Sequence, residues 1–102
     1  MMPPERSAMN QQKHDLATRR RRLRFRTTHT GFKETDILLG GFVAAHVEEL
    51  DEERVDEFER LLDINDDREV LDWITGRAPV PEAFATPVMT RLIRYVSERR
   101  RP

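Results

Sequence analysis

Apolar residues in this chain form short stripes at helical spacing, set in strongly charged sequence. In residues 52–63 the stripe is Val55, Phe58, Leu61 and Leu62, and all the remaining residues are charged. Residues three and four positions apart lie on one face of an α-helix, and this face needs other helices to cover it. No segment shows the alternation of apolar and polar residues, bounded by turns, that is typical of β-strands. The spacing therefore predicts an all-α fold.

The same pattern predicts a compact bundle of four to five short helices. The predicted helices span 15–28, 32–49, 52–63, 67–75 and 87–99. Side chains that can accept hydrogen bonds from first-turn amides precede four of them: Asp15, Asp51, the Asn65–Asp66 pair and Thr86. Gly76 follows the fourth helix as a C′ residue, and the proline-containing stretch 76–87 is expected to be a loop.

The 32–49 segment is apolar around much of its circumference, so we expect the central and most buried helix there. Its two apolar rows are Ile37, Leu38, Phe42 and Ala45, and Leu39, Val43 and His46. Gly40 and Gly41 each cost about 1 kcal/mol relative to alanine in a helix. We expect them to permit close approach of another helix, with a kink as the alternative.

The chain has 102 residues, which suits one domain, assigned to 15–99. The polar residues 1–14 are expected to be a disordered leader, and 100–102 a basic tail. No apolar stretch approaches the ~20 residues that span a bilayer, so we expect no membrane insertion. The N-terminus has no apolar region of a secretory signal. We expect a monomer.

Residue types argue against catalysis and metal binding. The chain contains no cysteine, which excludes disulfides and cysteine-ligated zinc. No serine lies in a nucleophile motif. The three histidines do not have metal-ligand spacing, and His46 is expected to be a hydrogen-bonded core or rim residue. We therefore predict no catalytic residue and no metal site.

Charge is strongly segregated along the chain. Residues 1–33 carry nine Lys or Arg and two Asp or Glu. Residues 48–72 carry only three Lys or Arg but thirteen Asp or Glu. The arginine run 19–26 has three possible targets: nucleic acid, an acidic partner, or the chain's own acidic segment. It lacks the spacing of a helix-turn-helix or zinc-finger reader, so we rank nucleic acid lowest.

Residues 29–36 have the sequence HTGFKETD and join the arginine run to the apolar 32–49 segment. Gly31 permits a tight turn there. Thr30 or Gly31 can serve as N-cap, with Glu34 reaching back as in a capping box. On spacing alone this junction is a plain helix start.

Taken in order, three pieces resemble a known family over about residues 18–98. They are RRRRLRFRTTHTGFKETDILLGGF, LDEERVDEFERLLDINDDREVLDWITGRAPVP and a final helix. The chain is similar to the small FAD assembly factors of succinate dehydrogenase. This resemblance implies a five-helix bundle that binds the flavoprotein subunit of succinate dehydrogenase or fumarate reductase. It also implies that the protein promotes covalent FAD attachment to that subunit and holds no cofactor permanently.

The resemblance assigns a docking surface to the junction. Gly31 and Glu34 match the glycine and glutamate of an Arg-Gly-x-x-Glu motif, and Thr30 stands where the motif has arginine. The implied partner-binding residues are Arg26, His29, Thr30, Gly31, Phe32, Lys33, Glu34 and Asp36. Family members work in the bacterial cytoplasm or the mitochondrial matrix.

Two alternatives remain open from the sequence. Because arginine offers planar, bidentate recognition that threonine does not, Thr30 is compatible with a divergent paralogue that binds a flavoprotein without promoting FAD attachment. The second alternative is a nucleic-acid-binding protein built on the 19–26 run.

Overall fold

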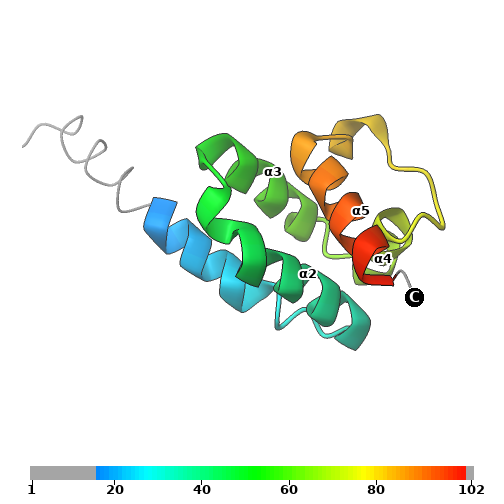
Figure 1. Cartoon of the computed structure of the whole chain (residues 1–102), viewed down its shortest axis with the longest axis horizontal. Helices are drawn as coiled ribbons and strands as arrows, with labels where there is room; N and C mark the ends of the chain where they lie inside the picture. Colours follow the sequence, from blue (N-terminus) through cyan, green and yellow to red (C-terminus); the bar gives the residue numbers. More distant parts are fainter. Residues whose placement is uncertain (1–15, 101–102) are drawn as a thin grey trace, which may run out of the picture.

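The structure is a computed structural model and describes residues 16–100. The first helix covers residues 16–26, and α2 is Lys33–His46, α3 Glu52–Asp63, α4 Asp67–Ile74 and α5 Pro87–Arg100. Two short 3₁₀ turns, η1 (Val47–Glu49) and η2 (Glu82–Phe84), complete the described part, which contains no strand. The predicted all-α bundle is confirmed (Figure 1). The predicted leader at 1–14, the Asp15 cap and residues 101–102 of the tail lie outside the described residues.

Helix boundaries follow the sequence signals closely, with two differences of more than one residue. The first helix ends at residue 26, not 28. The hydroxyls of Thr27 and Thr28 donate to the carbonyls of Leu23 and Arg24, at 2.8 and 3.2 Å. These bonds compete with continued helix. The other difference is at the end of α2, where His46 has φ −127° and the chain continues as η1. The 3₁₀ turn buries both Val47 and Leu50.

The predicted caps of the last three helices form. Asp51 and Asp66 accept from the amides of Arg54 and Glu69, at 3.0 and 3.1 Å. Thr86 accepts from the amide of Met89 at 3.2 Å.

The end of α4 is closed by a glycine, as predicted. Gly76 has φ +82°, and its amide donates to Trp73 O at 3.2 Å. The next amide, of Arg77, donates to Asp72 O at 2.8 Å. This pair of bonds is a Schellman motif, which satisfies carbonyls that a helix end leaves free.

The core lies where α2 and α3 face α5. The Phe42 ring lies 5.9 Å from Phe58 and 5.6 Å from Tyr95, measured between centroids. Fully buried aliphatic residues of every described helix surround these rings: Leu23, Leu39, Val43, Val55, Ile74, Leu92 and Val96. Burial of this set supplies most of the driving force for folding.

The expectation that α2 is the most buried helix is wrong. Five of its 14 residues are buried, against four of eight in α4. Ile37 is 52% exposed and Ala45 is also exposed, because neighbouring helices cover a narrower face of α2 than its sequence offers. Helix α2 is nevertheless central, since it contacts both α4 and α5.

Close approach of another helix explains Gly41, as predicted, whereas Gly40 faces the turn that follows the first helix. A Cβ on Gly41 would lie 2.4 Å from Tyr95 Oη of α5, and one on Gly40 would lie 3.0 Å from Thr28 Cγ2. Helix α2 runs through both positions without interruption. The two glycines lower the helix propensity of α2, but because they have no Cβ they let neighbouring atoms approach closely.

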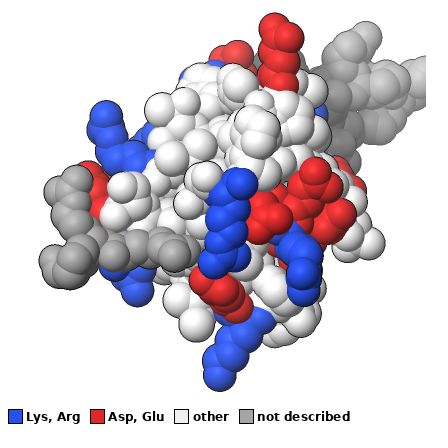
Figure 2. Space-filling model, turned by 90° about the vertical axis from the view of Figure 1, so that its right-hand side faces the viewer, with Lys and Arg blue, Asp and Glu red and all other residues white. Residues whose placement is uncertain are grey.

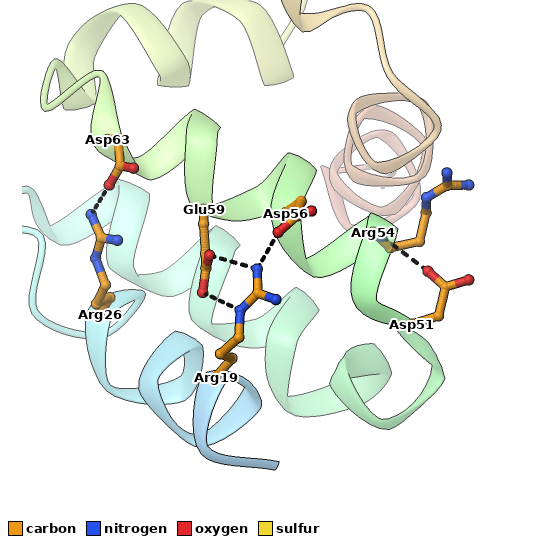
Figure 3. Close-up of polar contacts among 7 residues, drawn as sticks. All are labelled: Arg19, Arg26, Asp51, Arg54, Asp56, Glu59 and Asp63. Carbon is orange, nitrogen blue, oxygen red and sulfur yellow. Dashed lines mark hydrogen bonds and ion pairs between the residues drawn. The ribbon is translucent and has the colours of Figure 1, made fainter. Parts of the chain in front are cut away.

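The first helix runs antiparallel to α2 and lies against α3 (Figure 1). Arg19 fastens it to α3: its Nε donates to Glu59 Oε2 at 3.2 Å, and its Nη2 to Glu59 Oε1 at 2.8 Å (Figure 3). The same guanidinium contacts the Asp56 carboxylate. A bidentate pair of this kind combines charge with fixed geometry.

Three more arginines of the run also pair with the chain's own acidic segment. Arg20 and Arg24 face Glu48, at 3.7 and 2.9 Å, and Arg26 faces Asp63 at 3.1 Å. The sequence left three possible targets for the arginine run. The structure shows four arginines of 19–26 paired with one of them, the chain's own acidic segment. The pairing leaves fewer uncompensated cations for a nucleic acid.

We expect Arg19→Gln to lower the free energy of unfolding by about 1–2 kcal/mol, because Glu59 loses a charge-assisted bidentate partner at a partly buried site. Urea denaturation at low and high salt measures this loss, which should shrink as salt screens the pair. Arg22→Gln is the matched control, because Arg22 is exposed on the same helix. Equal destabilisation by both variants would show that the pairing contributes nothing.

Candidate functional site

The junction between the first helix and α2 is an organised turn. Gly31 has φ +94°, a conformation that residues with a side chain rarely adopt. On either side of it, Thr30 and Asp36 are joined: the Thr30 amide donates to Asp36 Oδ1 at 2.8 Å, and the Thr30 hydroxyl donates to the same oxygen. The Phe32 amide donates to Thr30 Oγ1 at 3.2 Å. We call this set of bonds the Thr30–Asp36 latch.

The latch corrects the predicted helix start. The N-cap of α2 is Phe32, with φ −122° and ψ 110°, and its side chain makes no capping bond. Neither Thr30 nor Gly31 is the N-cap, so Glu34 does not have capping-box spacing. Asp36, in the first turn of α2, accepts the hydrogen bonds that fix the start of the helix. The positive end of the helix dipole favours its negative charge there.

Thr30→Val tests the latch. Valine keeps the shape of threonine but removes the hydroxyl, so we expect a loss of about 1–2 kcal/mol in the free energy of unfolding. Amide hydrogen exchange at Phe32 should accelerate at the same time, because this amide loses its acceptor. Thr30→Ser keeps the hydroxyl and should stay close to the parent chain in both measurements. Unchanged exchange at Phe32 in the valine variant would contradict the latch.

An exposed aromatic stack lies beside the latch. Phe25 is 63% exposed, and its ring lies 4.0 Å from that of His29 with an interplanar angle of 16°. His29 Nδ1 is 2.8 Å from the Phe25 carbonyl oxygen. A proton on Nδ1 would satisfy this carbonyl and leave Nε2 as an acceptor. Phe25 is one of two large apolar side chains that are exposed among the described residues.

The predicted site residues fall into two groups. Four are exposed: His29, Gly31, Lys33 and Glu34. The other four are partly buried: Arg26 pairs with Asp63, Thr30 and Asp36 form the latch, and Phe32 packs against the core. The structure therefore brings all eight into one region and leaves four of them exposed at the surface.

A surface hollow of about 200 Å³ opens beside the stack. It is lined by Phe25, Arg26, His29, Thr30, Leu62, Asn65 and Asp67. The last three belong to α3, α4 and the turn between them, and the sequence did not place them near the junction. The asparagine at position 65 was a local sign of the turn between α3 and α4. It adopts φ +60°, a conformation that asparagine tolerates better than most residues.

A second hollow, of about 190 Å³, lies between α2 and α5. Among its lining residues are Phe42, His46, Arg94 and Tyr95. His46 lies at the rim as predicted, with 34% of its side chain exposed. Its Nδ1 lies 3.4 Å from Glu49 Oε1, within ion-pair distance, and has no partner that meets hydrogen-bond geometry in the described chain.

Charge on the end of the molecule shown in Figure 2 is mixed. Basic and acidic side chains alternate there across a largely uncharged surface, and the basic ones do not form a continuous patch. Within residues 16–100 no three or more His, Asp or Glu side chains are grouped to hold a metal ion. Over the same residues, no helix has the length and apolar character to cross a membrane.

Comparisons with known proteins point in one direction. The family model described as flavinator of succinate dehydrogenase matches residues 21–96. The FAD assembly factor SdhE of Acetobacter pasteurianus is 45% identical over 87 residues, covering 85% of this chain and 79% of that protein. The mitochondrial succinate dehydrogenase assembly factor 2-B of Drosophila melanogaster is 33% identical over 82 residues, covering 79% of this chain. The chain spans 53% of the fly protein's length. No solved structure gives a significant match.

Proposed function

The chain belongs to the family of succinate dehydrogenase flavinators, and we propose that it binds the flavoprotein subunit of succinate dehydrogenase and promotes covalent FAD attachment to it. The match from 21 to 96 includes most of the first helix, the junction and all of α2, α3 and α4. The fumarate reductase flavoprotein is a further client that we propose on the same grounds. The protein would work in the cytoplasm of a bacterium, or in the mitochondrial matrix of a eukaryote.

The proposal for the docking site rests on one observation: the rigid Thr30–Asp36 latch lies next to exposed side chains. The Thr30–Asp36 latch holds Gly31 at φ +94° without a side chain over it. A partner backbone can therefore approach closely there. His29, Lys33 and Glu34 surround this point and are exposed. A rigid, exposed surface loses little conformational entropy on binding.

We propose no catalytic residue on this chain. The new bond would form on the partner: the flavin methyl carbon would lose a proton and bond a histidine nitrogen of the flavoprotein, and the isoalloxazine would take up the electron pair as negative charge. The assembly factor would act by holding the flavoprotein in the conformation that stabilises this charge. Lys33 supplies an exposed cation at the junction, and Thr30 supplies none.

Co-expression with the flavoprotein subunit tests the proposal. The subunit should co-purify with this chain, and its covalent flavin, measured as fluorescence after denaturing electrophoresis, should rise above the level without the chain. Absence of a complex and an unchanged flavin signal would refute the proposal. A complex without added flavin would favour the divergent paralogue that binds but does not promote attachment.

A further inference from the structure

The hollow beside the junction has a carboxylate with no cation to balance it. Asp67 is half-buried in the hollow wall, and its carboxylate forms no ion pair or side-chain hydrogen bond with any residue of the described chain. Burial, and then the charges of Asp36 and Asp66, raise the pKa of Asp67 above its ordinary value. A carboxylate in these surroundings is destabilised as long as it stays ionised.

Arg26, the cation that lines the same hollow, is already paired. Its Nη2 lies 3.1 Å from Asp63 Oδ1 (Figure 3). Asp36, in turn, accepts from the neutral Thr30. The lining of the hollow therefore holds one carboxylate, Asp67, and one arginine that is already paired, while the nearby charges of Asp36 and Asp66 act on Asp67. An entering positive charge would relieve their mutual repulsion.

Other residues that line the hollow suit the stem of a long cationic side chain. The exposed face of Phe25, stacked on His29, can hold a guanidinium or ammonium by cation–π attraction. Leu62, partly buried against the core, offers apolar surface to methylene groups. A volume of about 200 Å³ accommodates one such side chain.

We propose that this hollow receives an arginine or lysine side chain of the flavoprotein partner, held between the Phe25–His29 stack and the Asp67 carboxylate. This inference rests on the proposed function, because the partner is the flavoprotein. It extends the docking surface from the junction to the start of α4. It also makes Asp67 a contact residue, in addition to its place in the first turn of a helix.

Asp67→Asn tests the inference, with binding to the purified flavoprotein subunit measured by titration calorimetry at low and physiological salt. We expect about tenfold weaker binding at low salt, because a desolvated charge pair is lost, and a smaller difference at higher salt. Glu69→Gln is the matched control: it removes one negative charge from the same helix turn, is exposed, and does not line the hollow. It should bind like the parent chain.

The thermal stability of the free chain separates a binding role from a structural one. Because the folded-state pKa of Asp67 is raised, its ionised form costs stability at pH values above that pKa. At neutral pH, Asp67→Asn should therefore leave the melting temperature unchanged or raise it. Weaker binding together with equal or greater stability supports the inference.

The other outcomes overturn the inference. If Asp67→Asn bound the flavoprotein as tightly as the parent chain, the inferred cation contact would be refuted. The proposed function would not be affected. Equal loss in Glu69→Gln would show long-range charge attraction in place of a seated side chain. Lower stability with weaker binding would make Asp67 a structural residue. A parent chain that does not bind the flavoprotein at all would refute the proposed function first.

Discussion

Replacing Gly31 with valine is expected to weaken flavoprotein binding, and the covalent flavin it supports, by about tenfold or more. The φ of +94° costs a residue with a side chain about 1–2 kcal/mol, and more for a β-branched one, where 1.4 kcal/mol corresponds to tenfold. A Cβ added at Gly31 would have no atom within 4 Å, so the backbone conformation alone is penalised. Relief of this strain would reorient the junction and open the Thr30–Asp36 latch. Binding titration and covalent flavin fluorescence measure the effect.

The chain provides a control for strain at another site. Gly76 has φ +82° and also has open space around a Cβ, but it closes the C-terminus of α4. Gly76→Val should destabilise the protein to a similar extent and leave flavoprotein binding close to that of the parent chain. If both variants lost binding equally, the loss at Gly31 would reflect general destabilisation, and the docking role of the junction would be contradicted.

Phe42→Ala is expected to lower the free energy of unfolding by about 3–5 kcal/mol, the range for removal of a buried aromatic side chain. Phe42 is 1% exposed, and its ring meets those of Phe58, Tyr95 and His46. Because small domains are stable by only about 5–15 kcal/mol, a large part of the population would unfold on mild heating. Urea denaturation followed by circular dichroism measures the loss.

Phe25→Ala is the matched control, since it makes the same chemical change at a ring that is 63% exposed. Its free energy of unfolding should stay within about 0.5 kcal/mol of the parent value, as for surface substitutions in general. A loss comparable to that of Phe42→Ala would mean that the Phe25 ring is buried in solution. The exposed stack and the hollow beside it would then not be available to a partner.

The helices were predictable because their signals are local. Apolar residues at helical spacing, the caps Asp51 and Thr86, and Gly76 at the end of α4 all act within a few residues of one another. Gly41 was also interpreted correctly, because a costly residue inside a helix needs a packing reason. By contrast, the N-cap of α2 was misplaced. Asp36 bonds back across six positions to Thr30, a spacing that no helix-start rule describes.

The site was predictable in part. The family resemblance directed attention to residues 29–36, and the structure gathers them with Arg26 in one region. It could not show that Arg26 is occupied by Asp63, because the two residues are far apart in the sequence. Nor did the pattern indicate that Ile37 would remain exposed, since exposure depends on which face of α2 its neighbours cover.

By itself, the sequence determined the helices, their caps and the opposition of basic and acidic segments, since these follow from residue type and short-range spacing. The tertiary structure decided which charges cancel and which do not. Arg19 is neutralised by α3, whereas Asp67 is left beside Phe25 and His29 without an ion pair in the described chain. Coulomb interactions depend on separation in space and on burial, and folding brings together residues that are distant along the chain. The geometry of the junction therefore depends on contacts that its eight letters, HTGFKETD, could not specify alone.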